Sequence, residues 1–286
     1  MKKTTSGTFF VLSGATLWGL IGLFTKNLAA IGFSSMEITA IRLAGAFLFM
    51  ALWYIFKDRS IFKIHIKDIW MFLGTGILSF VFFNWCYFNC IEMGSLSVAA
   101  VLLYTAPSFV MIMSAILFKE KITAKKVISQ LLTMTGCALV SDIAGAGSIS
   151  KTAILFGLGA GFGYALYSIF GRFALEKYSA SAVTLWTNLV GGFASLFLLN
   201  ITTFSAKILN AKAIFISIPL ILFSTISPLL LYTKGLERLE PSRASIIATL
   251  EPVVATLISV FVFSEPLSLF QGAGIALVIA AIILQN

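Results

Sequence analysis

The chain has 286 residues, of which 59% are hydrophobic and only 11% are charged, and its mean hydropathy is +1.01. A water-soluble domain of this length needs far more charge to cover its surface, so the composition excludes that class. The net charge of +9 does not indicate a nucleic-acid partner, because the basic residues lie in short connections between apolar stretches and do not form one exposed face.

Ten apolar runs follow one another along the chain, each close to the length that crosses the hydrocarbon core of a bilayer. Only helices satisfy the backbone of such runs in lipid, so we predict an all-α integral membrane protein with ten transmembrane helices. The runs cover residues 8–25, 36–56, 69–91, 95–118, 125–141, 152–171, 180–200, 213–233, 241–263 and 267–285.

Lysine and arginine are distributed unequally between alternate connections. Four of them fall on one side, at Lys26, Lys151, Lys207 and Lys212. Positive residues are retained on the cytoplasmic side, so we expect a multi-pass protein of the bacterial inner membrane with both termini in the cytoplasm. The other side receives fifteen: Lys2, Lys3, Lys57, Arg59, Lys63, Lys67, Lys119, Lys121, Lys125, Lys126, Arg172, Lys177, Lys234, Arg238 and Arg243.

The two halves of the chain repeat at a spacing of 145–146 residues, which predicts domains at 1–143 and 150–286. Each half contains five expected helices, an odd number, so the second half enters the membrane from the opposite side. Inverted repeats of this kind are typical of transporters that work by alternating access, although membrane enzymes and channels also arise by duplication. The matched residues include Pro107 and Pro252, Glu120 and Glu265, Glu92 and Glu237, Tyr87 and Tyr232, and Lys26 and Arg172.

The order of short motifs resembles the EamA domain of the drug/metabolite transporter superfamily, twice in succession over nearly the whole chain. The motifs are Leu17-Trp18-Gly19 with Lys26, Ile41-Arg42-Leu43, the stretch from Pro107 to Glu120, and Glu251-Pro252 continuing to Glu265. The resemblance implies a ten-helix fold in which the first, third, fourth, sixth, eighth and ninth helices surround a central cavity. It also implies transport of amino acids, amines, nucleobases or similar metabolites.

Glu251 is the most informative side chain, because a carboxylate about eight residues into an apolar helix is costly and usually faces a cavity or a partner. It is a candidate proton carrier or counter-charge for a cationic solute; the alternative is a structural carboxylate beside the Pro252 kink. Asn84 and several aromatic residues complete the expected substrate site, since their rings suit solutes with apolar or cationic parts. These aromatic residues are Trp18, Tyr87, Tyr104, Tyr164, Tyr167 and Tyr232.

Other residues suggest gating or structural roles. Lys26 with Glu92, and Arg172 with Glu237, end neighbouring helices at opposite mouths of the expected pathway, where they form either latches or independent interfacial charges. Independent interfacial charges are the favoured interpretation. Arg42 is close enough to the outer interface to reach it, which favours a structural role. Pro107 and Pro252 kink their helices, for gating or for packing.

No metal site or cofactor is expected. Cys86, Cys90 and Cys137 lie in apolar runs, and His65 is the single histidine. Four glycines between residues 157 and 163 lack the Lys-Ser/Thr ending of a phosphate loop and predict close helix packing.

We expect a monomeric secondary transporter whose partners are a small solute and membrane lipid, and the leading interpretation is an exporter of amino acids or related compounds. Proton coupling stays open. One alternative is an importer or exchanger of amines or nucleobases. Another is a lipid-handling protein or membrane enzyme, but the sequence shows no set of residues that would form a catalytic site.

Overall fold

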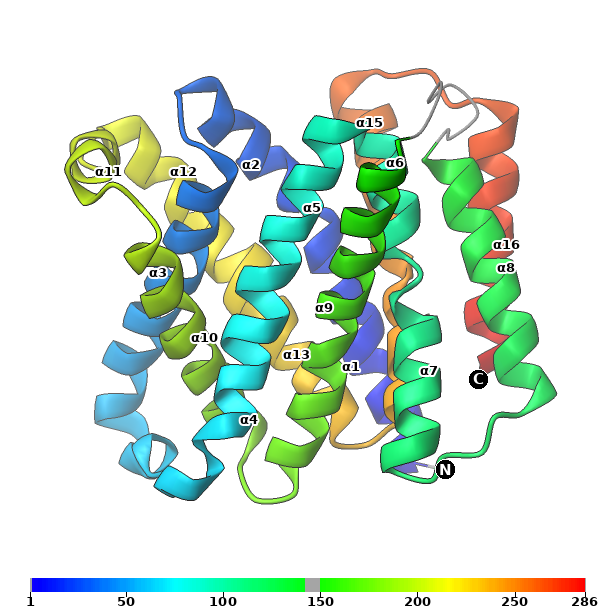
Figure 1. Ribbon diagram of the computed structural model, residues 1–286, viewed down its shortest axis with the longest axis horizontal. Coiled ribbons are helices and arrows are strands. Elements are labelled where there is room, and N and C mark those ends of the chain that lie inside the picture. The colour runs from blue at the N-terminus through cyan, green and yellow to red at the C-terminus, as the bar shows by residue number, and fades with distance from the viewer. Residues whose placement is uncertain (1, 142–149, 286) are drawn as a thin grey trace.

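The computed structural model describes residues 2–141 and 150–285, and the regular elements in these ranges are all helices. Most of them run side by side, with their connections gathered at the two ends of the molecule (Figure 1). Both chain termini lie toward the same end, here called the termini side, and the opposite end is the far side. The domain ends expected at residues 1, 143 and 286 lie outside the described residues.

The first half of the chain contains α1 (Lys2–Gly19), α2 (Ile21–Ala30), α3 (Ser35–Lys57), α4 (Ile69–Leu73), a π-helical segment (Gly74–Val81), α5 (Phe82–Met93), α6 (Leu96–Leu103), α7 (Ala106–Leu117) and α8 (Ala124–Val140). The second half contains α9 (Lys151–Leu175), α10 (Ala180–Phe197), α11 (Ile201–Ile208), α12 (Ala211–Ile221), a second π-helical segment (Leu222–Ile226), α13 (Ser227–Leu236), α14 (Pro241–Ala248), α15 (Leu250–Phe263) and α16 (Leu269–Gln285).

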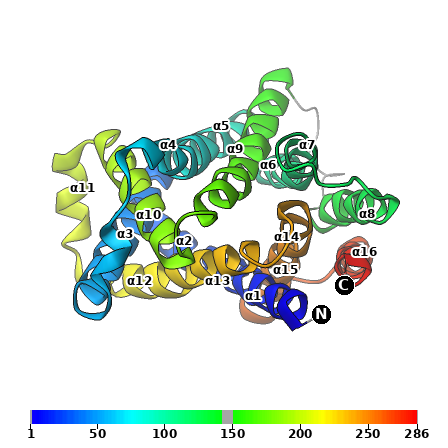
Figure 2. The same cartoon turned by 90° about the horizontal axis from the view of Figure 1, so that it is seen from below.

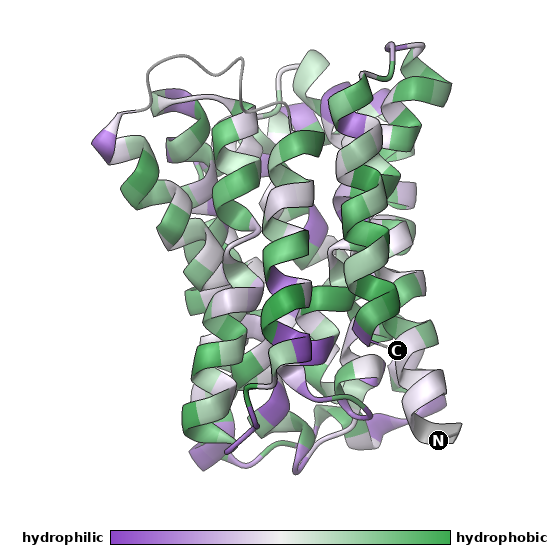
Figure 3. Ribbon diagram, turned by 90° about the vertical axis from the view of Figure 1, so that its right-hand side faces the viewer, coloured by the Kyte–Doolittle hydropathy of each residue, from purple (hydrophilic) through white to green (hydrophobic). Residues whose placement is uncertain are grey.

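Eight helical stretches of the described chain are long and apolar enough to cross a membrane. The remaining two expected runs correspond to α8 and α16, which have 17 residues each. Helix α16 is apolar, whereas α8 carries polar side chains that include Lys126 and Gln130. Apolar residues cover most of the helices, and hydrophilic ones gather toward the termini side (Figure 3). The prediction of a multi-pass helical membrane protein is therefore confirmed.

Side-chain caps explain where many helices begin. Ser34 and Glu37 form a capping box at α3, in which each side chain bonds the other residue's backbone N–H. Serine, threonine or asparagine side chains accept the same kind of bond at the starts of α6, α8, α9, α10, α11 and α12. The short helix α11 was not expected from the sequence, because it interrupts a polar connection.

Five of the expected long helices are interrupted where the sequence predicts continuous runs. Breaks separate α1 from α2, α6 from α7 and α14 from α15, and π-helical turns precede α5 and α13. Pro107 and Pro252 each fall in the first turn of the helix after a break. A missing N–H is harmless in a first turn, so these prolines begin new segments and do not kink continuous helices.

Helices α8 and α16 form a closely packed pair at one edge of the molecule, set apart from the other helices (Figure 2). The pair meets at two glycines. A Cβ on Gly136 would lie 2.8 Å from the carbonyl oxygen of Gly274, and one on Gly274 would lie 2.6 Å from the carbonyl oxygen of Gly136. Only glycine permits this backbone approach, as in small-residue packing between membrane helices.

Candidate functional site

The first residues of α15 place a carboxylate near the middle of the molecule. Thr249 ends α14, and Glu251 follows in the first turn of α15. Its side chain is half-buried, and the hydroxyl of Tyr164 on α9 donates a hydrogen bond to Glu251 Oε2 at 3.3 Å. Two helices of the second half of the chain, α9 and α15, therefore meet at this carboxylate.

Arg42 supplies the opposite charge. Its side chain turns inward from α3, and Nε donates to Thr225 Oγ1 at 3.3 Å in the second π-helical segment. The guanidinium is also close enough to Glu251 to interact with it electrostatically. Arg42 was expected to lie within reach of the outer interface in a structural role; its side chain is directed instead to Thr225, and depth along a helix does not reveal which way a side chain points.

Aromatic residues surround this pair of charges. Tyr164 lies edge-on to Phe83 with ring centroids 5.4 Å apart, and Phe83 lies 5.8 Å from Tyr87. Tyr87 and Tyr104 are both within electrostatic range of Glu251. Four of the predicted site residues thus gather here: Glu251, Tyr164, Tyr87 and Tyr104. We call these four residues with Arg42 the central site.

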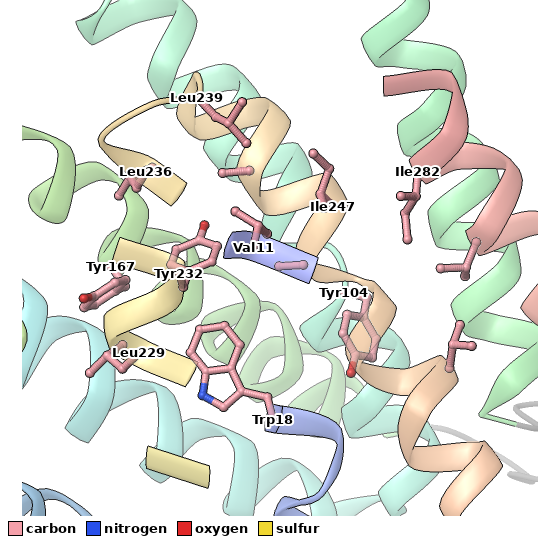
Figure 4. Packing of buried hydrophobic residues seen from close by; sticks show 14 of the residues in the cluster. Val11, Trp18, Tyr104, Tyr167, Leu229, Tyr232, Leu236, Leu239, Ile247 and Ile282 are labelled. Carbon is pink, nitrogen blue, oxygen red and sulfur yellow. The ribbon is translucent and has the colours of Figure 1, made fainter. Parts of the chain in front are cut away.

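A second set of predicted residues lies beside the central site, in an apolar cluster. The ring centroids of Trp18 and Tyr232 are 5.4 Å apart, and those of Tyr167 and Tyr232 are 6.1 Å apart (Figure 4). The Tyr167 hydroxyl is hydrogen-bonded to Thr233 and the Tyr232 hydroxyl to Ser168. These three aromatic rings form a continuous buried surface next to the charges, with their tyrosine hydroxyls already engaged.

Asn84 is placed differently from the other predicted residues. It is buried, and its amide donates to the carbonyl oxygen of Phe80 one turn earlier at 2.7 Å. In this arrangement its side-chain N–H group is directed to its own helix.

The same apolar cluster closes the termini side of the central site. Val11, Leu236, Leu239 and Ile247 pack with the aromatic rings in one group of buried side chains (Figure 4). Val11 belongs to α1, Leu236 to the end of α13 and Ile247 to α14, and Leu239 lies in the connection between the last two, so three helices of the molecule converge here.

Packing between the interrupted helices differs at the two ends. On the termini side α7 packs against α14, whereas the far-side segments α6 and α15 do not form an extended contact with each other. Side chains near the far end of α15 are exposed, including Phe261 at 80%. The two ends of the central region are therefore unequal, with the termini side the more tightly packed.

The predicted charge pairs have other partners in the described chain. Lys26 Nζ lies 4.4 Å above the ring of Phe263, and Glu92 is exposed. Arg172 donates to the carbonyl oxygen of Leu236, and Glu237 accepts from the backbone N–H of Ala180. Neither predicted pair forms an ion pair in the described residues.

A different charged group joins the ends of these helices on the termini side. Lys126 Nζ lies 3.3 Å from Glu120 Oε2 and 2.7 Å from Glu240 Oε2, and the Ser242 hydroxyl donates to Glu120 Oε2. We call Glu120, Lys126, Glu240 and Ser242 the Lys126 cluster. Sequence reasoning missed this cluster, although it matched Glu120 with Glu265 in the repeat.

The Lys126 cluster borders a cavity of about 700 Å³ on the termini side. Five basic and three acidic residues line this cavity, so its lining carries more positive than negative charge. The basic residues are Lys119, Lys121, Lys126, Arg172 and Arg238.

Neither a metal site nor a reactive thiol emerges from the described chain. No three His, Cys, Asp or Glu side chains gather there as a bound ion would need. The cysteines are buried, and the Cys90 thiol donates to the carbonyl oxygen of Ala153 between α5 and α9. The glycines of α9 pack closely, as predicted: added Cβ atoms on Gly157 and Gly161 would collide with α6.

These features define the class: a helical membrane protein built around a half-buried polar centre that tight packing separates from one side of the membrane. A family model described as the EamA-like transporter family matches residues 5–142 and again residues 151–286, and the chain belongs to this family.

Relatives of similar length are also named transporters. Two proteins of Archaeoglobus fulgidus, each named an uncharacterized transporter, are 30% and 26% identical to this chain, covering 93% and 97% of it and 94% and 95% of their own lengths. The Salmonella typhimurium protein YicL, named an uncharacterized inner membrane transporter, is 24% identical over 99% of this chain and 96% of its own length. One crystal structure shares the fold with a TM-score of 0.82 at 15% identity, covering 98% of this chain and 96% of that one.

Proposed function

We propose that the protein is a secondary transporter that exports amino acids or closely related metabolites by alternating access. The observation that carries this proposal is the central site, where Glu251 and Arg42 place opposite charges among aromatic rings. An α-amino acid has the complementary pair of charges. Glu251 would bind its ammonium group, Arg42 its carboxylate, and the rings its side chain.

Ten membrane-spanning helices in two inverted repeats are part of this proposal. Local geometry recurs at a spacing of 145 residues, which supports duplication. Lys119 and Ser264 both have φ of 56°, and the N–H groups of Glu120 and Glu265 bond the carbonyl oxygens of Ser114 and Ser259. The twofold match to the family model supports the same conclusion. Helices α8 and α16 would be the fifth and tenth spans.

The proposed orientation places the termini side in the cytoplasm. Its support is the excess of lysine and arginine in the connections on that side. The positively lined cavity then opens toward the cytoplasm, where it would concentrate solutes that carry a carboxylate before export. One chain provides the complete central site, so the proposed functional unit is a monomer.

The test is thermal unfolding of purified protein in the presence of amino acids, quaternary amines and nucleobases. A ligand that binds only the folded state raises the unfolding midpoint. Stabilisation by an amino acid is expected, and Glu251→Gln should weaken it. Glu265→Gln is the matched control, because Glu265 is exposed in the connection after the same helix.

Each other outcome points to a different function. Stabilisation by amines or nucleobases alone would favour a transporter of those solutes over an amino-acid exporter. Stabilisation only by lipids would favour a lipid-handling protein. Direction is tested separately with proteoliposomes loaded with the stabilising solute, where loss of solute from vesicles with the cytoplasmic face inward is expected for an exporter.

A further inference from the structure

The helices around the central site form two groups that contact each other mainly on the termini side, which the proposed orientation places in the cytoplasm. In the first group α5, α6 and α7 pack along α9. In the second group α13, α14 and α15 pack along α1. Between the groups, α7 and α14 make the main contact, whereas α6 and α15 on the outer side do not pack together. The pathway in this arrangement is therefore closed toward the cytoplasm.

The Lys126 cluster connects the two groups at this contact. Glu120 follows α7 of the first group, and Lys126 lies in the first turn of α8. Glu240 and Ser242 belong to the start of α14 in the second group. The bond from Ser242 to Glu120 thus crosses the boundary directly, and Lys126 on α8 bridges it by pairing with both Glu120 and Glu240.

Burial makes the cluster sensitive to the separation of the groups. The side chains of Lys126 and Glu120 are 9% and 8% exposed, whereas Glu240 is 57% exposed. Two buried charges are stable only while their partners remain in place. Separation of α14 from α7 would remove Glu240 and Ser242, so opening must break or rehydrate the cluster. Because the cluster borders the cytoplasmic cavity, water can reach it there.

We propose that the Lys126 cluster is a lock that holds the cytoplasmic gate closed and must open in each transport cycle. This inference rests on the proposed alternating-access function. The lock acts on conformation and not on solute recognition, because none of its four residues belongs to the central site. Its loss shifts the population toward the state that is open to the cytoplasm.

A second ion pair on the same side provides a matched control. Lys177 Nζ lies 2.6 Å from Asp68 Oδ1, and this hydrogen bond raises the pKa of Lys177 above its usual value. Lys177 follows α9 and Asp68 precedes α4, and α4 packs against α9. The pair therefore lies on one side of the boundary and should not respond to gate opening.

The experiment measures access from the cytoplasm to a cysteine placed behind the lock. Ala248→Cys is suitable, because Ala248 is buried in the apolar cluster between the lock and Glu251. The three native cysteines are replaced in the background. A membrane-impermeant maleimide is added to inside-out vesicles, and the labelling rate is compared between Lys126→Gln, Glu240→Gln and Lys177→Gln.

We expect Lys126→Gln to raise the labelling rate by roughly tenfold or more, because it leaves Glu120 buried without its cation. Glu240→Gln should raise it less, and since Glu240 is largely exposed this variant should fold even if Lys126→Gln does not. Lys177→Gln should leave the rate unchanged. Equal labelling rates in the unmodified background and in both lock variants would overturn the proposal. A rise of the labelling rate in Lys177→Gln as large as that in the lock variants would overturn it too. No solute is needed, so failure to bind amino acids would reject the proposed substrate without affecting this result.

Discussion

Replacement of Gly161 by alanine tests whether the close packing of α9 against α6 positions the central site. An added Cβ would lie 2.5 Å from Thr105 Oγ1 and 2.8 Å from the carbonyl oxygen of Leu102. The Thr105 hydroxyl is already bonded to that carbonyl at 2.6 Å, and a backbone oxygen cannot rotate away. The two helices must therefore move apart, and Tyr164 lies on α9 three residues after the substitution.

The expected cost follows from two opposing effects. Overpacking of this kind costs about 1–3 kcal/mol. Alanine is more favourable than glycine within a helix by about 0.5–1 kcal/mol, which offsets part of that cost. Gly171→Ala in the same helix isolates the second effect, because its added Cβ would find its nearest neighbour, Leu236 Cδ2, at 3.4 Å. The first variant should lose about 1–2 kcal/mol of unfolding free energy, and the second should gain up to about 1 kcal/mol.

Thermal unfolding of both purified variants, with and without the stabilising solute, measures these differences. The Gly161→Ala midpoint should fall and the Gly171→Ala midpoint should stay level or rise. Solute affinity should fall only in Gly161→Ala, because only that substitution displaces Tyr164 from Glu251. Matching midpoints and affinities in the two variants would refute the argument that this contact positions the site.

Three further predictions concern other contacts. Gly136→Ala should destabilise the α8–α16 pair in thermal unfolding, whereas Gly272→Ala should not, since its added Cβ meets no atom within 4 Å. Arg42→Gln should weaken binding of an amino acid by roughly 10-fold to 100-fold and leave binding of an amine without a carboxylate unchanged, as measured by calorimetry. Equal losses of affinity for both ligands would contradict the assignment of Arg42 to the solute carboxylate. Ser97 and Glu265 match Ser242 and Glu120 at the 145-residue spacing, so cysteines at these two positions should cross-link only when the outer side closes. The cross-link should then block transport. Uninhibited transport by fully cross-linked protein would exclude closure at this point.

The membrane helices could be predicted from the sequence because apolar length alone determines them. Their interruptions were less accessible. Pro107 and Pro252 marked the correct places, but a proline is compatible with both a kink and a new first turn. The π-helical turns left no signal, since the residues Gly74–Val81 are as apolar as their neighbours.

The candidate site was predicted in part for a similar reason. Glu251 was identified because a carboxylate in an apolar helix is costly, and Tyr164 because it is an aromatic residue in a helix that the family resemblance places around the cavity. The direction of Arg42 depends on rotation about its helix and on Thr225, a distant partner. Lys126 could not be distinguished from Lys125, because both lie in the same basic connection and only the folded chain buries one of them.

The π-helical turns have a consequence for how the helices that carry Tyr87 and Tyr232 are oriented. Each residue of an α-helix advances the side chains by about 100°, so a turn that holds one additional residue rotates everything after it by a similar angle. Gly74–Val81 precedes Tyr87, and Leu222–Ile226 precedes Tyr232. Deletion of one residue within either segment would restore regular winding and swing the tyrosine toward a different neighbour. The direction of these two rings therefore depends on the wide turn that precedes each of them, and a change of winding there would reorient both rings without replacing either tyrosine.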